Sequence, residues 1–140
     1  MIFTKIILVT LVFLAKTDII VPLRECVVDP EGEYKYIQIM MISLQDKYFN
    51  KIIVRGSKIY NTHADIYMDF MNNIEKNDNT LFRSFIWKPI GGGYINASRY
   101  QILVGGSSGS YGKCNHVLTS DIIRPCFPDD VQIKYDPSYN

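Results

Sequence analysis

One segment constrains the fold of this chain more than any other. Residues 33–44 read Glu-Tyr-Lys-Tyr-Ile-Gln-Ile-Met-Met-Ile-Ser-Leu. In an extended chain, successive side chains point to opposite faces of a sheet. Both faces of this segment carry large apolar side chains: Ile37, Ile39 and Met41 on one, Tyr36, Met40 and Ile42 on the other. A strand with two apolar faces has to be covered on both, so we predict the central strand of a sheet.

The remaining pattern mixes strands with helices and shows no repeat. Residues 51–55 predict a second strand that Gly56 ends, and an apolar stripe predicts a helix over residues 63–76. Residues 113–124 predict a second helix that Pro125 ends. Further strand candidates are residues 84–88, 91–93, 100–104 and 131–135. The prediction is an α/β fold: one domain over residues 23–140, with a mixed twisted sheet flanked by two α-helices, after an apolar segment at residues 1–22.

Composition excludes some classes of protein. With 140 residues, 47% of them hydrophobic, the chain is long enough for one core and is not of the disordered class. The net charge is +1 and no run of lysine and arginine occurs, so nothing predicts a nucleic-acid partner.

Residues 6–15 form an unbroken run of ten largely apolar residues after a short basic start. This length is typical of a signal peptide and too short to span a bilayer, so we expect no stable membrane association. Phe13 lies two residues before Ala15, which makes a poor cleavage site. Two other interpretations of this segment are an N-terminal strand and an incorrectly assigned start of the protein sequence. We expect a cytoplasmic protein. The alternative is a secreted protein in which residues 1–15 act as a signal peptide. A secreted interaction domain is a further functional alternative, and it rests on this segment alone.

The cysteines favour the cytoplasm. There are three, Cys26, Cys114 and Cys126, so at least one is unpaired. Cys114 and Cys126 flank the second predicted helix, which would place them roughly 18 Å apart. A disulfide requires a Cα separation below about 7 Å. Pro125 could change this geometry, but free thiols are the simpler interpretation and indicate a reducing compartment.

His63 lies where the first predicted helix begins. Asn61 and Thr62 are favourable N-cap residues, and Asp65 falls in the first turn. The backbone N–H groups at a helix N-terminus have no partner within the helix and can hold an anion. The N–H groups of His63 and Ala64 are the candidates here. This arrangement suits a histidine base that acts on a bound phosphate.

Residues 105–112, Gly-Gly-Ser-Ser-Gly-Ser-Tyr-Gly, form a second candidate site. Their N–H groups could curl into an anion nest around Ser108 and Ser110, although a flexible surface turn is the simpler interpretation of the composition. Lys35 and Arg55 are ordinary solvated charges if taken alone. Together with a nest and a helix N-terminus they would complete a phosphate cradle.

Other phosphate and hydrolase motifs are incomplete. A nucleotide-binding P-loop would need glycine at position 107, which is serine, and a cysteine phosphatase would need arginine at position 120, which is also serine. No G-x-S-x-G occurs. His63 and His116 have no recognised metal-ligand spacing, so we predict no metal and no cofactor. His116 is expected to be structural.

Five blocks together resemble one family. They are Glu-Tyr-Lys-Tyr at 33–36, Val-Arg-Gly at 54–56, His-Ala-Asp-Ile-Tyr at 63–67, the glycine triplet at 91–93, and Ser-x-x-Tyr-Gly at 108–112 with His116. In order and spacing, over some four-fifths of the chain, they resemble the small protein phosphohistidine phosphatases of the janus/ocnus family. The block at His63 is the most specific.

The resemblance implies metal-independent removal of phosphate from histidine in proteins, so the expected partners are phosphohistidine-containing proteins, and we expect a monomer. It implies that His63 is catalytic and that Lys35 contacts substrate. It assigns phosphate binding to Ser108-Gly109-Ser110 and a supporting positive field to Arg55. Two positions depart from the family pattern: Tyr94 replaces an arginine after the glycine triplet, and Lys113 replaces a proline.

A mechanism can be stated in physical terms. Neutral His63 would deprotonate a water molecule or attack phosphorus itself, and the residues leave both routes open. A helix N-terminus with Lys35 and Arg55 nearby disfavours the imidazolium form. The alternative is a janus-like protein that binds phosphate or phosphohistidine with little turnover, which the loss of a cation at Tyr94 favours.

Overall fold

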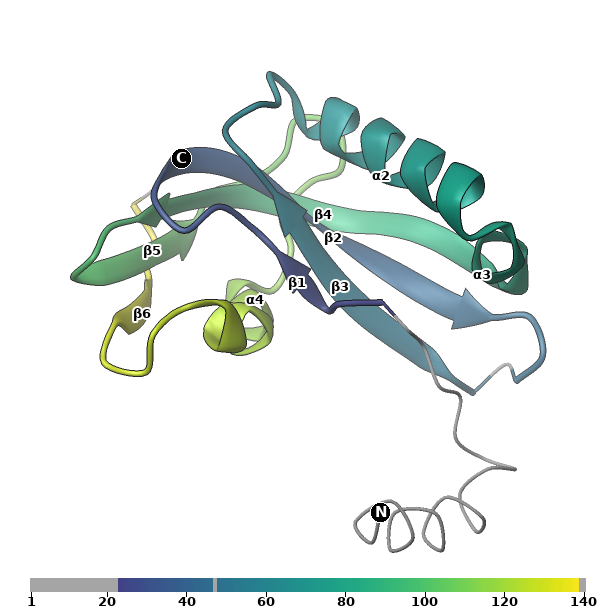
Figure 1. Cartoon of the computed structure of the whole chain (residues 1–140). Helices are drawn as coiled ribbons and strands as arrows, with labels where there is room; N and C mark the ends of the chain where they lie inside the picture. The colour runs from purple at the N-terminus through teal and green to yellow at the C-terminus, as the bar shows by residue number, and fades with distance from the viewer. Residues whose placement is uncertain (1–22, 47, 139–140) are drawn as a thin grey trace, which may run out of the picture.

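A computed structural model of the chain describes residues 23–46 and 48–138. Within these residues six strands form one sheet in the order β1-β3-β2-β4-β5-β6 (Figure 1). The strands are β1 (Cys26–Val27), β2 (Gly32–Ser43), β3 (Asn50–Gly56), β4 (Phe85–Ala97), β5 (Gln101–Gly105) and β6 (Gln132–Tyr135). The two outermost pairs, β1 with β3 and β5 with β6, are parallel, and the inner pairs are antiparallel. The predicted mixed sheet is confirmed.

The strand β2 lies at the centre, as its two apolar faces predict. It pairs with β3 along one edge and with β4 along the other. Tyr36, Ile37, Ile39 and Met41 are completely buried. Neighbours along the strand point to opposite faces, so β2 contributes to two separate cores, one on each side of the sheet.

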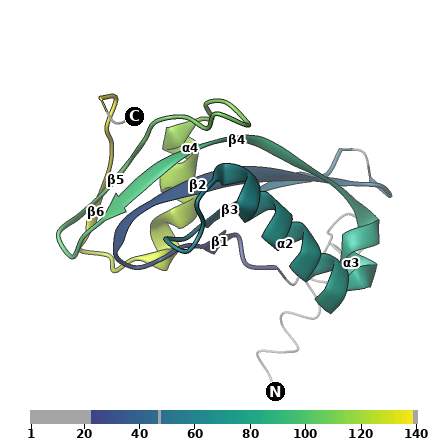
Figure 2. The ribbon, with the colours of Figure 1, turned by 90° about the horizontal axis from the view of Figure 1, so that it is seen from above.

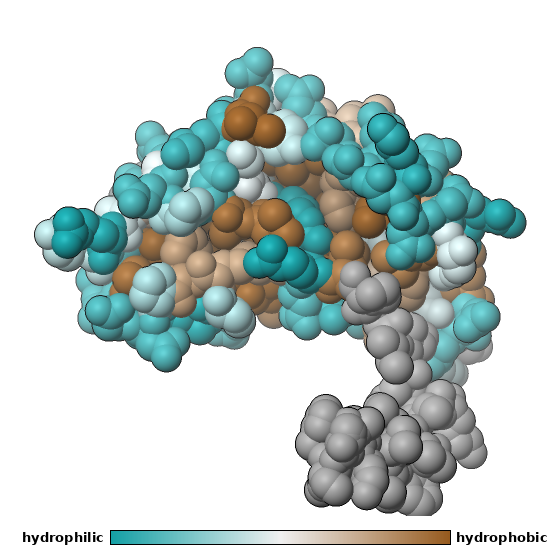
Figure 3. All heavy atoms as spheres, in the orientation of Figure 1, coloured by the Kyte–Doolittle hydropathy of each residue, from teal (hydrophilic) through white to brown (hydrophobic). Residues whose placement is uncertain are grey.

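Helices cover both faces. The helix α2 (His63–Asn77) packs Ile66, Phe70 and Ile74 onto one face, and the short helix α3 (Asn79–Ser84) follows it. The helix α4 (His116–Ile123) and the 3-10 turn η1 (Arg124–Cys126) lie on the other face (Figures 1 and 2). The outer side of α2 is largely hydrophilic (Figure 3). None of the helices in the described part of the chain is long and apolar enough to cross a membrane.

Three details differ from the sequence prediction. The helix α3 was not predicted: the Asp78 side chain accepts a hydrogen bond from the Leu81 N–H at 3.1 Å and starts a new helix where we expected only an end. Strand β4 continues from Phe85 through the glycine triplet to Ala97. The second helix begins at His116, three residues later than predicted, because the Asn115 side chain caps it by accepting from the N–H groups of Val117 and Leu118.

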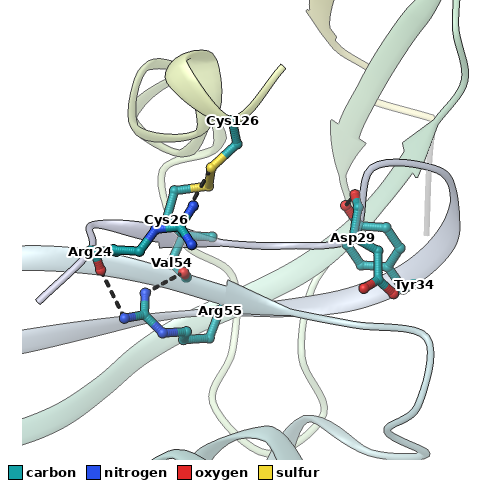
Figure 4. The surroundings of a disulfide bond; sticks show 7 residues. All are labelled: Arg24, Cys26, Asp29, Tyr34, Val54, Arg55 and Cys126. Atoms are coloured by element: carbon teal, nitrogen blue, oxygen red, sulfur yellow. Dashed lines mark hydrogen bonds between the residues drawn. A yellow bond between two sulfur atoms is a disulfide. The ribbon is translucent and has the colours of Figure 1, made fainter. Parts of the chain in front are cut away.

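The cysteine prediction was wrong for two of the three residues. Cys26 and Cys126 form a disulfide with a Cα separation of 6.6 Å (Figure 4), whereas Cys114 is free. The distance estimate along the second helix tested only the pair Cys114 and Cys126. The fold instead places η1 beside β1, which brings together two residues 100 positions apart in the chain. The apolar run at residues 6–15 lies outside the described residues, so the predicted division near residue 22 stays a prediction.

Candidate active site

His63 is the first residue of α2, and its side chain is fixed by the sheet. The Thr62 side chain caps the helix by accepting from the Asp65 N–H at 3.0 Å. This leaves the N–H groups of His63 and Ala64 at the helix N-terminus for an anion. The His63 side chain is buried, and its Nε2 lies 2.9 Å from the Gly93 carbonyl oxygen. A carbonyl only accepts, so Nε2 donates and the neutral ring carries its lone pair on Nδ1.

The glycine triplet makes room for this ring. A Cβ built on Gly92 would lie 3.0 Å from His63 Cδ2, 3.2 Å from Ser108 Cβ and 2.5 Å from the Tyr36 carbonyl oxygen. Because Gly92 has no side chain, His63 and the predicted phosphate loop meet over the same point of β4. The structure therefore brings His63 and Ser108 together, as the site prediction requires.

Lys35 and Tyr94 also lie near the histidine. They are cross-strand partners on β2 and β4, and Lys35 Nζ is 5.5 Å from the centre of the Tyr94 ring. The Tyr94 ring meets His63 edge to face, with 5.5 Å between ring centres. Burial lowers the pKa of His63, Lys35 lowers it further, and the hydrogen bond to the Gly93 carbonyl partly opposes both. The surroundings thus favour the neutral imidazole that a base or nucleophile needs.

The loop around Ser108 is more closed than an open nest. Its Oγ accepts from the N–H groups of Ser110 at 3.2 Å and Tyr111 at 3.0 Å. The Ser108 N–H donates to the Gly112 carbonyl at 3.0 Å. These bonds leave the Gly109 N–H and the hydroxyl hydrogens of Ser108 and Ser110 as the donors that the Ser108-Gly109-Ser110 tripeptide can offer without rearrangement. The sequence could not show this, because it depends on the path of the loop.

His116 supports the loop from the opposite face of the sheet. It is buried, its Nε2 donates to the Gly106 carbonyl at 2.6 Å, and its Nδ1 accepts from the Tyr36 hydroxyl. The Tyr36 hydroxyl also accepts from Thr119 at 3.0 Å and lies 3.3 Å from the Cys114 sulfur. Both nitrogens of His116 are therefore used within the fold, which agrees with a structural role. Sequence reasoning missed this buried polar network, and no local pattern indicates it.

Arg55 is bound by partners other than His63. Its guanidinium donates to the carbonyls of Val54 at 2.9 Å and Arg24 at 2.8 Å (Figure 4). It also lies over the Phe70 ring at 5.2 Å from the ring centre. Its backbone is two strands from Gly92 across β2, roughly 10 Å at the usual strand spacing. Burial lowers the pKa of Arg55 to about 10, so it keeps its charge at neutral pH. Its contribution to the site stays a prediction.

Comparison with known proteins identifies the family. Residues 21–131 match the model of the Janus/Ocnus family. The chain belongs to the Janus/Ocnus family. All of the predicted site residues lie within the matched range, so the resemblance inferred from five short blocks is confirmed.

The Janus/Ocnus relatives are distant and of two kinds. The sex-regulated protein janus-A of Drosophila mauritiana is 29% identical over 106 residues, which cover 73% of this chain and 71% of the relative. The janus-A protein of Drosophila simulans matches equally. The 14 kDa phosphohistidine phosphatase of Sus scrofa is 29% identical over 108 residues, covering 73% of this chain and 81% of the relative.

Among residues 23–46 and 48–138, no three His, Cys, Asp or Glu side chains cluster as metal ligands would.

Proposed function

We propose that this protein is a metal-independent protein phosphohistidine phosphatase with His63 as its catalytic residue. One observation carries the proposal: the Gly93 carbonyl holds His63 Nε2, which leaves the Nδ1 lone pair available at the N-terminus of α2, beside Lys35 and Ser108. The likeness to the pig phosphohistidine phosphatase supports the substrate class, phosphohistidine-containing proteins. Hydrolysis of the P–N bond fits this site because the bond is labile and needs positioning and charge stabilisation more than activation.

Two routes satisfy the geometry. In one, Nδ1 takes a proton from water, the water oxygen bonds to phosphorus, and the P–N bond to the substrate imidazole breaks. In the other, Nδ1 attacks phosphorus as that P–N bond breaks, and water then hydrolyses the phosphorylated His63. In both, the leaving imidazole gains a proton. General base catalysis, as in the first route, increases the rate roughly 10²–10⁴-fold.

The phosphoryl oxygens need several positive partners. The N–H groups of His63 and Ala64 face them from the helix, and a helix N-terminus contributes about 0.3–1 kcal/mol. Lys35 adds a full charge, and the Ser108 hydroxyl and the Gly109 N–H add hydrogen bonds. The N–H of Ser110 would join only if the phosphate displaced Ser108 Oγ. We expect His63, Lys35 and this loop to be jointly necessary.

The first experiment is phosphate release from a phosphohistidine peptide in EDTA. Wild-type protein should release phosphate, and His63→Ala should lower the rate by at least about 10²-fold, the contribution of one general base. His63→Gln is the matched variant, because its amide can still donate to the Gly93 carbonyl but is not a base. We expect it to be as slow as His63→Ala, with both variants melting near the wild type. A His63→Gln rate close to wild type would show that His63 only fills space.

The alternative is a regulatory protein that binds phosphohistidine with little turnover. Tyr94 favours it, because its ring occupies the side of His63 where the family pattern expects an arginine. The janus-A relatives, named for sex regulation and not for an activity, fit it as well. In the same assay, binding of the peptide without release of phosphate would establish this alternative.

Location and assembly are separate proposals. The Cys26–Cys126 disulfide removes the cysteine-based reason for a cytoplasmic protein and favours the exported alternative, since such bonds persist in oxidising compartments. Mass spectrometry of the native protein would measure both its N-terminus and its free thiols. Two reduced cysteines at positions 26 and 126 would restore the cytoplasmic interpretation. The expected monomer can be checked by light scattering.

A further inference from the structure

A polar pocket of about 420 Å³ opens beside the active site, and one of its walls is Tyr94, whose ring contacts His63. Its walls include Lys35 and Tyr94 from the paired strands β2 and β4, and Lys58, Tyr60 and Asn61 from the segment that leads into α2. The same two residues act on His63: the Tyr94 ring packs against its imidazole, and the charge of Lys35 lowers its pKa. The pocket and the catalytic residue therefore share a wall.

The order of groups along this face gives the substrate a direction. Ser108 and His63 both lie against Gly92. Tyr94 is two residues further along β4 and points to the same face, about 7 Å away at the usual rise of a strand. A phosphoryl group held between His63 and the Ser108 loop would lie next to the Tyr94 ring, which contacts His63. The rest of the substrate could then extend over Tyr94 into the pocket.

The walls suit a flat ring that carries an anion. Tyr60 and Tyr94 offer aromatic surface, and the ammonium groups of Lys35 and Lys58 outnumber the single carboxylate of Glu33 in the lining. Aromatic rings pack favourably edge to face or offset against one another. Tyr60 is held in place by its hydroxyl, which donates to Asp69 on α2. An imidazole packs on such walls better than the flexible alkyl chain of a phosphorylated lysine.

We propose that this pocket binds the imidazole of the phosphorylated histidine and that Tyr94 is the residue that selects it. The inference rests on the proposed function, because it names the part of the substrate that the site recognises besides phosphate. Phosphate on a histidine ring is then preferred over phosphate on an alkyl amine and over free phosphate. The competing interpretation is that Tyr94 only packs against His63, in which case its loss would affect all phosphorylated ligands alike.

Binding measurements separate the two interpretations without requiring turnover. The probes are a peptide with a stable phosphoryl-triazole mimic of phosphohistidine, a phosphonomethyl mimic of phospholysine in the same peptide, and inorganic phosphate. Tyr94→Leu should weaken binding of the histidine mimic by about three- to tenfold, the usual contribution of an aromatic pair. It should change the other two affinities by less than about twofold, and Tyr94→Phe should restore the wild-type values.

Tyr100 provides a matched control, because it is 75% exposed and lies outside the pocket lining. Tyr100→Leu should leave all three affinities unchanged. Equal losses for all three probes in Tyr94→Leu, or no loss for the histidine mimic, would overturn the inference. Wild-type protein adds a test that needs no variant: the histidine mimic should shift the amide resonances of Lys58 and Asn61, whereas phosphate should not. Absence of these shifts would also overturn it.

The outcomes distinguish this inference from the proposed function. Selective binding of the histidine mimic without phosphate release from the real peptide would retain the pocket and reject the phosphatase. Phosphate release that Tyr94→Leu slows equally for histidine and lysine substrates would retain the phosphatase and reject the pocket.

Discussion

At the scale of the residue, the protonation of His63 controls the proposed chemistry. The imidazole acts as base or nucleophile only when neutral, so activity requires a pH above its pKa. Burial lowers that pKa from its ordinary value of 6.5, and the positive charge of Lys35 lowers it further. The fraction of neutral His63 at pH 6 is therefore larger than that of an exposed histidine.

We accordingly predict that His63 titrates below pH 6.5 and that Lys35→Gln raises its pKa, since removing a nearby positive charge stabilises the imidazolium form. Proton NMR of the imidazole Cε1–H resonances measures both. The chain has only two histidines, and the His63→Gln variant assigns the spectrum by removing one signal. A midpoint at or above 6.5, or no change on Lys35→Gln, contradicts the prediction.

At the scale of the element, α2 and the Ser108 loop can approach β4 closely because the glycines at positions 91–93 of this strand have no side chains. Residues 91–93 pair with β2 directly beside a register shift between Gln38 and Ile39, and they leave space for His63 on one face and His116 on the other. A Cβ on Gly93 would lie 2.7 Å from His116 Cε1 and 2.3 Å from the Gly105 carbonyl oxygen. The helix α2 and the Ser108 loop can therefore both pack closely on β4 at residues 91–93.

Gly92→Ala should destabilise this arrangement, because its Cβ would meet the Tyr36 carbonyl oxygen at 2.5 Å and backbone cannot easily move aside. We expect the free energy of unfolding in urea to fall by roughly 1–3 kcal/mol, as for other overpacked sites, and phosphate release to fall with it as His63 is displaced. Gly109→Ala is the control for stability, since nothing lies within 4 Å of its added Cβ. Equal stability of the two variants would show that β4 adjusts without cost.

At the scale of the whole molecule, the disulfide joins the first described strand to the last helical turn. Cys26 on β1 and Cys126 in η1 close a loop with a sequence separation of 100. Such long loops gain the most from a cross-link in the chain-entropy model, and removal of a native disulfide from a small domain costs about 2–5 kcal/mol. Edge strand β1 consists of only two residues, and the bond adds to the hydrogen bonds that hold its segment against β3.

We predict that dithiothreitol lowers the free energy of unfolding of the wild type by about 2–4 kcal/mol. The double variant Cys26→Ser/Cys126→Ser should show the lower stability with or without the reductant. Cys114→Ser is the matched control, because Cys114 is free and the variant should keep the full response to reductant. Unfolding curves of the wild type that coincide in oxidising and reducing buffer would show that the bond does not stabilise the protein.

Local patterns were sufficient to predict the long strands, the helices α2 and α4 and the identity of the candidate base, but not α3 or the two-residue strand β1. The alternation along β2 and the stripe on α2 are properties of neighbouring residues, and Thr62 caps α2 directly before His63, as its side chain predicts. The five short blocks were likewise enough to indicate the family. The sequence by itself therefore determined the mixed sheet, the helix that carries His63, and the Janus/Ocnus resemblance.

Only the tertiary structure decided which distant residues meet. It paired Cys26 with Cys126, placed the Arg55 guanidinium against the Arg24 carbonyl, and closed the Ser108 loop on its own hydroxyl. Each of these contacts depends on strand register and on the path of a loop. The spacing of nearby residues does not predict strand register or the path of a loop, because both result from the simultaneous packing of the two faces of one sheet.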